Sequence, residues 1–289
     1  MKFIRNILVA ASLTTLCACS DSGATAPTIA VSVEPQRYLL EQLTGDKFKV
    51  VTLMKQGANP ETFEPTMKSR MALDCASAYF YVGGLPFEHA LLQSATDIMV
   101  LESTSGIVPL YGTHSHHHHD NEECSHEESG EESDPHVWTS VKNAKVMADN
   151  MARGLIALDP ADSCMYKSRL QSLMARLDSL DSSIASRLEQ SNATCFMVWH
   201  PSLGYFARDY GLEQLSVGWE SKEPSASALR RAIDQARSHG AKVFFYQREF
   251  DTRQTQAMTS QLGLRTVTID PLSYDWQHQM NIITDELVK

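Results

Sequence analysis

The chain contains one long stretch without glycine or proline, from Ala161 to His200. Apolar residues recur within it every three or four positions, at Tyr166, Leu170, Leu173, Leu177, Leu180, Ile184 and Leu188. This spacing predicts one amphipathic helix of about 30 residues, roughly 45 Å long. A coiled coil would show a similar stripe, but within an α/β chain a helix that packs across two domains explains it more simply.

Short apolar strands alternate with helices on both sides of this stretch. The expected strands are 28–34, 48–54, 78–82, 98–101, 195–199, 242–246 and 265–269. The other expected helices are 36–43, 66–76, 141–158, 226–239, 252–262 and 277–288. Strands that are apolar throughout and separated by helices indicate parallel sheets covered on both faces. The expected fold is therefore α/β, with two parallel-sheet lobes joined by one long backbone helix and a ligand cleft between the lobes.

The amino terminus has the form of a lipoprotein leader. Lys2 and Arg5 precede an apolar segment, Ile7–Leu16, that is too short to span a bilayer, and Leu16-Cys17-Ala18-Cys19 follows. Cleavage before Cys19 would leave that cysteine as the lipid-bearing terminus. An ordinary signal peptide is the alternative. No later run is apolar enough for a transmembrane helix, so we expect an exported protein, lipid-anchored in the periplasm or at the cell surface.

These features divide the chain into five parts. They are a signal peptide (1–18), a tether (19–27), an N-terminal lobe (28–160) with a His-rich loop (112–135), a linking helix (161–192) and a C-terminal lobe (193–289). The formal charge is −10, and loss of the leader with its two basic residues makes it −12. This balance argues against nucleic acid as a partner, since such recognition needs a basic face. Two of the four remaining cysteines could form a disulfide, but the sequence does not determine the pairing among Cys75, Cys124, Cys164 and Cys195.

Histidines are concentrated in one short segment. Six of the eleven in the chain lie there, at His114, His116, His117, His118, His119 and His126. Carboxylates follow, so the segment has little apolar surface to bury. A dense array of imidazoles suits Zn²⁺, Cu²⁺ or Ni²⁺. A solvated acidic loop or an expression tag are the other interpretations, and a tag fits poorly with an interrupted, internal run.

Four potential metal ligands lie near the carboxyl ends of expected strands or where the His-rich loop ends. They are Glu61, His136, His200 and Asp270, two from each lobe. In open α/β sheets ligands bind at that edge. Two imidazoles and two carboxylates suit Zn²⁺, with Mn²⁺ also acceptable. Each residue alone is also a common turn or cap former.

Several motifs resemble the substrate-binding proteins of zinc- and manganese-type ABC transporters, the metal-binding cluster called A-I. The motifs are Gly57–Pro65, Asp134–Trp138, Trp199–Leu212, Glu223–Ala226, Gln261–Gly263 and Asp270–Leu272. The resemblance, which runs from about residue 28 to the end, implies the two-lobed fold expected above. It also implies an ABC permease and its ATPase as partners, with Zn²⁺ as the transported ligand.

The resemblance implies metal ligation by His136 and His200, and by Asp270 in some members of the family. Glu61 departs from the pattern, which usually has His at that position, and this raises the case for manganese or iron. His200 favours zinc again, because manganese-type members tend to carry Glu there. The His-rich loop resembles the charged loop of zinc-type members and is expected to collect ions weakly for the main site.

The expected function is capture of extracytoplasmic Zn²⁺ by a monomer and its delivery to the permease. The stiff linking helix permits only small rocking of the lobes. An uptake protein for Mn²⁺ or Fe²⁺ is the alternative, followed by a metal-dependent adhesin or store. A zinc hydrolase needs an open coordination position and a nearby base. The sequence shows no His-Glu-x-x-His pattern, so we expect no enzyme.

Overall fold

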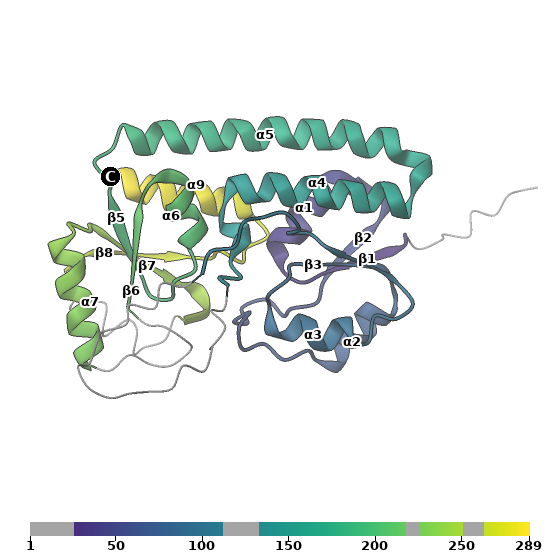
Figure 1. Cartoon of the computed structure of the whole chain (residues 1–289), viewed down its shortest axis with the longest axis horizontal. Helices are drawn as coiled ribbons and strands as arrows, with labels where there is room; N and C mark the ends of the chain where they lie inside the picture. Colours follow the sequence, from purple (N-terminus) through teal and green to yellow (C-terminus); the bar gives the residue numbers. More distant parts are fainter. Residues whose placement is uncertain (1–25, 112–132, 218–225, 251–262) are drawn as a thin grey trace, which may run out of the picture.

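Two four-stranded parallel sheets lie at opposite ends of the molecule's long axis, and one long helix runs along both (Figure 1). The computed structural model describes residues 26–111, 133–217, 226–250 and 263–289. The long helix is α5 (Ser163–Glu189), with 27 residues. At 1.5 Å per residue it spans about 40 Å. No helix in these four ranges is long and apolar enough to cross a membrane.

The N-terminal lobe contains the first sheet, with strand order β2-β1-β3-β4. Its strands are β1 (Thr28–Val31), β2 (Lys49–Thr52), β3 (Ala76–Tyr81) and β4 (Met99–Glu102). Its helices are α1 (Glu34–Thr44), η1 (Gly45–Lys47), α2 (Met67–Asp74), α3 (Pro86–Leu92), η2 (Val137–Thr139), α4 (Val141–Leu158) and η3 (Pro160–Asp162). All three strand pairings are parallel.

The C-terminal lobe repeats the same strand order, as β6-β5-β7-β8. Its strands are β5 (Cys195–Val198), β6 (Glu213–Ser216), β7 (Val243–Gln247) and β8 (Arg265–Ile269). Its helices are α6 (Gly204–Tyr210), α7 (Ala226–Ser238), η4 (Arg248–Phe250) and α9 (Trp276–Val288). Strand order reverses beside β5, where ligand sites of such sheets form.

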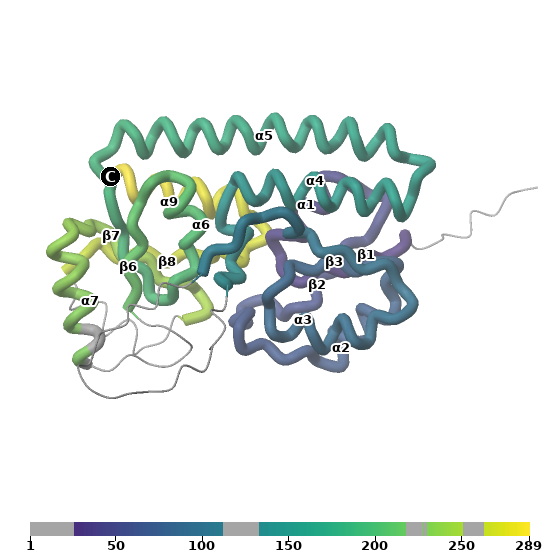
Figure 2. The backbone as a smooth tube through the Cα atoms, in the orientation of Figure 1, coloured from purple at the N-terminus to yellow at the C-terminus, as the bar shows by residue number. Residues whose placement is uncertain are grey.

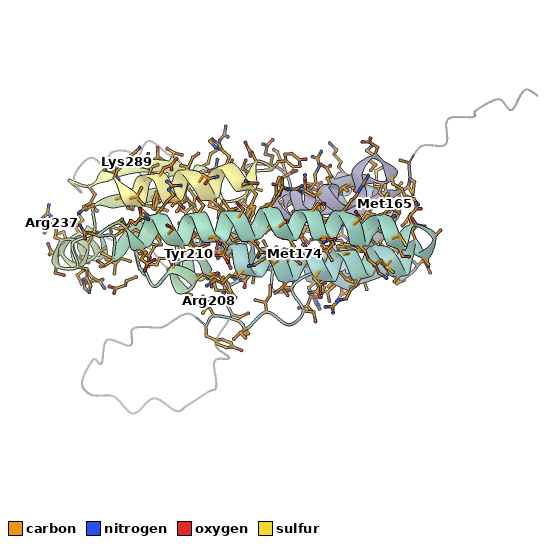
Figure 3. All side chains as sticks on the ribbon, turned by 90° about the horizontal axis from the view of Figure 1, so that it is seen from above. Met165, Met174, Arg208, Tyr210, Arg237 and Lys289 are labelled. Carbon is orange, nitrogen blue, oxygen red and sulfur yellow. The ribbon has the colours of Figure 1, made fainter. Side chains whose placement is uncertain are left out.

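One hydrophobic core extends through both lobes. It includes Ile29 and Phe80 of the first sheet, Phe245 of the second, and Leu177 of α5. Helices α1, α4 and α9 form a layer between α5 and the sheets (Figure 2). Seen from above, α5 lies over the seam between α4 and the row of α1 and α9 (Figure 3). The lobes are therefore packed together and not merely tethered.

Hydrogen bonds at the helix ends follow from the local sequence. Thr66 and Ser140 accept backbone N–H groups at the starts of α2 and α4. The Gln36 side chain accepts the N–H groups of Ser32 and Val33 at the start of α1. These bonds satisfy donors that the first helical turn leaves free. Helix α6 ends at Gly211, whose φ of 68° favours glycine.

The fold class expected from the sequence is confirmed, with shifts at element boundaries. The first strand ends at Val31 rather than at 34, because Glu34 and Pro35 already begin α1. Helices α3 and α6 and strand β6 were not predicted from the sequence. Strand β6, with the sequence Glu-Gln-Leu-Ser, has a single buried residue and no apolar run to reveal it.

Some expectations fall outside the described residues. These are the leader with Cys19, the histidines at 114–126, Cys124, and the helix expected at 252–262. Among the described cysteines, Cys75 and Cys164 are exposed and free, and Cys195 is buried and free.

Replacing one buried leucine of α5 tests this helix as the shared support of both lobes. Leu177→Ala removes a side chain that is 2% exposed, and we expect a loss of about 2–5 kcal/mol in the free energy of unfolding. The exposed neighbour Ser179 provides the control, and Ser179→Ala is expected to change stability by less than about 0.5 kcal/mol. Urea denaturation measures both. Equal effects would show that α5 is not packed as described.

Candidate metal centre

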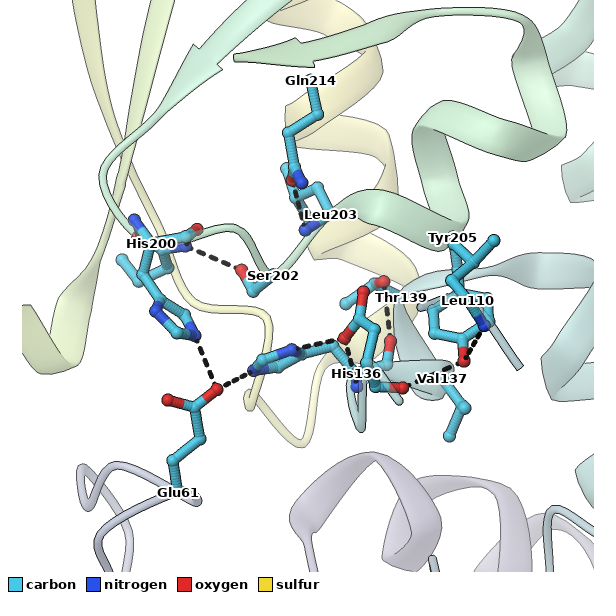
Figure 4. Close-up of polar contacts among 12 residues, drawn as sticks. Glu61, Leu110, His136, Val137, Thr139, His200, Ser202, Leu203, Tyr205 and Gln214 are labelled. Atoms are coloured by element: carbon cyan, nitrogen blue, oxygen red, sulfur yellow. Dashed lines mark hydrogen bonds and ion pairs between the residues drawn. The ribbon is translucent and has the colours of Figure 1, made fainter. Parts of the chain in front are cut away.

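Three side chains from distant parts of the chain meet between the lobes. Glu61, His136 and His200 each offer one ligand atom, and these atoms lie within 4.8 Å of one another. Both imidazoles point toward the Glu61 carboxylate (Figure 4). Glu61 Oε1 lies 3.1 Å from His200 Nε2 and 3.9 Å from His136 Nε2. The two imidazole ring centroids are 5.1 Å apart.

The histidines are almost fully buried, whereas Glu61 keeps some contact with solvent. The side chains of His136 and His200 are 5% and 6% exposed, and that of Glu61 is 25% exposed. Glu61 follows β2 in an irregular segment, where its N–H donates to Asn59 Oδ1 at 2.9 Å. An ion held by these groups would lose most of its hydration shell to protein ligands.

Asp134 holds the His136 imidazole in place. Its Oδ1 accepts the His136 backbone N–H at 2.9 Å and lies 2.7 Å from His136 Nδ1. A carboxylate on Nδ1 favours the tautomer in which Nε2 carries the free lone pair. Gly204, the first residue of α6, lets this helix approach: a Cβ there would lie 2.8 Å from Asp134 Oδ2.

The ends of the segment that carries the histidine run are fastened beside His136. Tyr111 and Ser133 form an isolated antiparallel bridge, and the Asp134 N–H donates to Leu110 O at 2.7 Å. Tyr205 of α6 also holds these flanking residues: its hydroxyl accepts the Leu110 N–H at 3.1 Å and donates to Asp134 O at 2.9 Å (Figure 4). Residues 112–132 thus begin and end next to the cluster.

Gln247, the last residue of β7, positions His200. Gln247 Oε1 accepts the His200 N–H at 3.3 Å, while its Nε2 donates to His200 O and to Ser202 Oγ. The His200 ring also packs on Phe250, with centroids 5.3 Å apart. Buried His200 Nε2 faces the Glu61 carboxylate, with Oε1 at 3.1 Å (Figure 4). A metal ion bound there would take both atoms as ligands in place of the proton that they share.

The cluster changes the protonation of its own members. Burial opposes ionisation of Glu61, but contact with His200 and the charge of His136 outweigh it and hold the carboxyl pKa below its usual value. Burial likewise disfavours protonation of His136, yet Asp134, Glu61 and Glu249 raise its pKa. Glu61, His136 and His200 therefore attract a proton or a metal cation to the space between their side chains.

Asp270 lies apart from the three-residue cluster. It directly follows β8 and pairs with Arg248 Nη1 at 3.6 Å. Burial raises its pKa, although Arg248 opposes the rise. Glu249, which follows β7, has its pKa raised to about 7 by burial and by the nearby charge of Asp270. Two further carboxyl groups therefore face this region from the C-terminal lobe.

The three-residue donor set has the chemistry and spacing of a transition-metal site. Ligand atoms about 2.0–2.1 Å from a tetrahedral Zn²⁺ lie about 3.3–3.5 Å apart. The separations of 3.1 and 3.9 Å lie on either side of that value. Two imidazoles suit Zn²⁺ better than Mn²⁺, which prefers oxygen ligands.

The three clustered residues were predicted from the sequence, but the residues that support them were not. Glu249 lies two residues after β7, and not directly after it as Asp270 does after β8, so its position gave a weaker signal. Gln247 and Tyr205 gave no signal, because their roles depend on the packing of β7 and α6 against other segments.

Comparison with known protein families gives a match over most of the chain. Residues 29–289 match the family described as ZnuA, zinc-uptake complex component A, periplasmic. A putative metal-binding protein of Treponema pallidum is 27% identical over 251 residues, which cover 83% of this chain and 78% of that protein. The zinc-binding protein AdcA of Streptococcus pyogenes is 25% identical over 243 residues. That match covers 80% of this chain but 47% of AdcA, so the chain spans about half of that relative.

A solved structure is similar over nearly its whole length. A crystal structure of ZnuA superposes with a TM-score of 0.79 at 31% sequence identity. The match covers 91% of this chain and 98% of that structure. The two-lobed architecture is thus shared with a known structure.

Binding of Zn²⁺ is expected to weaken as pH falls, because the ion needs the unprotonated Nε2 of His136. Since Asp134, Glu61 and Glu249 raise the pKa of His136 above its usual value despite burial, proton competition begins at a higher pH than it would for an ordinary imidazole. Below that pKa the affinity should fall by up to about tenfold per pH unit. Competition titrations against a zinc-binding dye from weakly acid to alkaline pH measure this. An affinity that stays constant over this range would contradict the prediction.

The Asp134→Asn variant tests the role of this carboxylate in the same titration. Without the Asp134 charge the His136 pKa is lower, so the onset of proton competition should move to lower pH. The affinity at alkaline pH should also drop about 10–100-fold, because the imidazole loses the group that orients it. A pH profile that coincides with that of the native chain would show that Asp134 does not act on His136.

Proposed function

This chain belongs to the ZnuA family of periplasmic zinc-uptake components, and we propose that it captures Zn²⁺ outside the cytoplasm and delivers it to an ABC permease. The observation that carries this proposal is the buried trio in which Glu61 lies between two imidazoles. The burial of both imidazoles beside this carboxylate adds support. The permease and its ATPase would accept the ion for import.

Zinc is preferred over manganese or iron in this proposal. Of the three clustered side chains, two are imidazoles, and they favour Zn²⁺ at equal availability. Glu61 adds a hard oxygen ligand and a negative charge, so Mn²⁺ is the second candidate. An uptake protein for Mn²⁺ or Fe²⁺ would use the same residues with a lower affinity for zinc.

Asp270 is the proposed fourth ligand. Its present partner, Arg248, has a side chain that is 71% exposed, and an ion pair with so exposed a group is weak. Burial makes the Asp270 carboxylate costly to ionise, and a nearby divalent cation would reverse that cost. Asp270 would then break its ion pair with Arg248 and bind the metal ion as the lobes move slightly closer. The shared core and α5 allow only a small movement for this step.

The histidine run is proposed to collect zinc for the cluster. Both ends of residues 112–132 are fastened beside His136 through Tyr111, Ser133 and Tyr205. Weak, multiple imidazoles there would raise the local zinc concentration without holding the ion firmly. The transfer would be short, because the last histidine of the run, His126, lies only eight residues before Asp134 in the sequence.

We propose that the mature protein is anchored by lipid at Cys19 and acts as a monomer that binds without catalysis. A hydrolytic zinc site needs an open position and a base that activates water. Here the carboxylate closest to the imidazoles is itself a ligand candidate. An adhesin or metal store would share the site but lack a permease partner. Zinc uptake by cells with and without the chain separates these alternatives.

Removal of single ligands tests the main site. We expect His136→Ala and His200→Ala to weaken Zn²⁺ binding about a hundredfold or more, and Glu61→Gln somewhat less because the amide oxygen still reaches the ion. Exposed His278 and Glu64 provide matched controls, and His278→Ala and Glu64→Gln should bind as the native chain does. Titration of the metal-free protein with Zn²⁺ and Mn²⁺ in competition measures these affinities. Stronger binding of Mn²⁺, or full zinc affinity in His200→Ala, would overturn the proposal.

Deletion of residues 114–126 tests the auxiliary role of the histidine run. We expect the affinity of the main site to change by less than about threefold, because the deleted residues lie outside the cluster. Growth or zinc uptake should fall only when zinc is scarce. Total loss of zinc binding in the deletion variant would show that the run itself is the principal site.

A further inference from the structure

A hollow lies at the edge of the first sheet opposite the metal cluster. It measures about 380 Å³ and is lined by Thr28, Lys49 and Val51 of β1 and β2, and by Lys68, Met71 and Cys75 of α2 and its end. Thr28 and Lys49 are the first residues of their strands. The cluster, in contrast, is built from residues that follow strands. We call this feature the basal hollow.

The charge of the basal hollow is opposite to that of the whole chain. Its charged lining residues are two lysines, and no carboxylate lines it, although the chain has a formal charge of −10. Neither Lys49 nor Lys68 forms an ion pair with a described residue, whereas Lys47 and Lys145 each pair with two aspartates. The hollow therefore presents positive charge that the described protein leaves unpaired.

Apolar side chains lie beside these lysines on the outside of α2. Met67 and Met71, one helical turn apart, are 73% and 61% exposed. In the described structure they are among six large apolar side chains with such exposure. Flexible apolar side chains next to lysines are typical of surfaces that lie at a membrane interface.

The short length of chain between Cys19 and the first strand limits how far the basal hollow can lie from the membrane. Eight residues separate Cys19 from Thr28, so even a fully extended chain holds Thr28 within about 30 Å of a lipid on Cys19. Thr28 is itself part of the hollow's lining. In an anchored chain the hollow stays close to the membrane, while most of the second sheet lies farther along the molecule (Figure 1).

We propose that the basal hollow docks on anionic phospholipid headgroups of the membrane that carries the chain. Lys49 and Lys68 contact the phosphates, and Met67 and Met71 enter the headgroup layer. This inference rests on the lipid anchor included in the proposed function. Docking orients the molecule so that the metal cluster, at the opposite edge of the sheet, faces the aqueous space where zinc is collected. Delivery to a permease then requires the basal hollow to leave the membrane surface.

Two exposed cysteines allow a test within one molecule. Cys75 lines the hollow, whereas Cys164, in the first turn of α5, is not among its lining residues; both are free and exposed. The lipidated full chain is reconstituted in vesicles of phosphatidylcholine alone or mixed with phosphatidylglycerol. The alkylation rate of each cysteine by a bulky, water-soluble maleimide is then measured by mass spectrometry. We expect phosphatidylglycerol to slow alkylation of Cys75 roughly tenfold and to leave Cys164 unchanged. High salt should abolish the protection.

Paired lysine variants make the test specific. Lys49→Gln with Lys68→Gln should lose the protection of Cys75, whereas Lys167→Gln with Lys242→Gln, which removes the same charge from exposed lysines elsewhere, should keep it. Equal protection in both variants, or equal protection on neutral vesicles, would overturn the inference. Loss of Cys75 protection when inorganic phosphate is added at matched ionic strength would also overturn the inference, because the hollow would then bind a soluble anion. Protection that appears only when a permease is present would overturn it as well.

The outcome is separable from that of the proposed function. Zinc titration of the same vesicles tests the metal cluster, which lies at the opposite sheet edge and is expected to bind normally in both lysine variants. If the chain floats with the vesicles but Cys75 stays fully reactive, the docking inference fails and the lipid anchor stands. If the chain does not float, the anchor is wrong and docking is rejected with it.

Discussion

The structure depends on holding two buried imidazoles from different lobes close to one carboxylate. Burying His136 and His200 without partners for their ring nitrogens costs free energy, and two carboxylates offset this cost. Asp134 satisfies Nδ1 of His136, and Glu61 Oε1 lies 3.1 Å from Nε2 of His200. Glu61 provides the negative charge that offsets the positive charge of a proton or a metal ion. The site is therefore ready for a cation before one arrives.

Tight packing between the lobes keeps the two imidazoles close to the Glu61 carboxylate. Helix α5 packs on α1 and α4 of one lobe and α9 of the other, and one core joins the two sheets. Hydrogen bonds also cross between the lobes near the site: Trp276 Nε1 donates to Trp138 O at 2.7 Å, and Tyr205 joins Leu110 to Asp134. A soft hinge would let the imidazoles separate and take up water. The packed junction instead limits the protein to small movements, which suit a ligand as small as a metal ion.

Periodicity and strand order explain what could be predicted from the sequence. The apolar stripe of α5 and the apolar runs of β1, β5 and β7 predicted the lobes, because burial leaves a direct pattern in such elements. Strand β6 and helix α6 were missed, since β6 has little apolar content and α6 is only seven residues long. The rule that ligands follow strands selected Glu61 and His200, and the end of the His-rich loop selected His136. It could not predict that Asp270 would pair with Arg248, because that contact depends on side-chain positions in two separate segments.

The most direct measurement of the central claim is anomalous X-ray diffraction at the zinc absorption edge from crystals of the zinc-loaded chain. One strong anomalous peak is expected about 2.0–2.1 Å from Nε2 of both His136 and His200, with a Glu61 oxygen at a similar distance. Weaker peaks near the histidine run are compatible with this site. A dominant peak elsewhere, with the Glu61 carboxylate still lying between two unliganded imidazoles, would show that the three residues are not the principal zinc ligands.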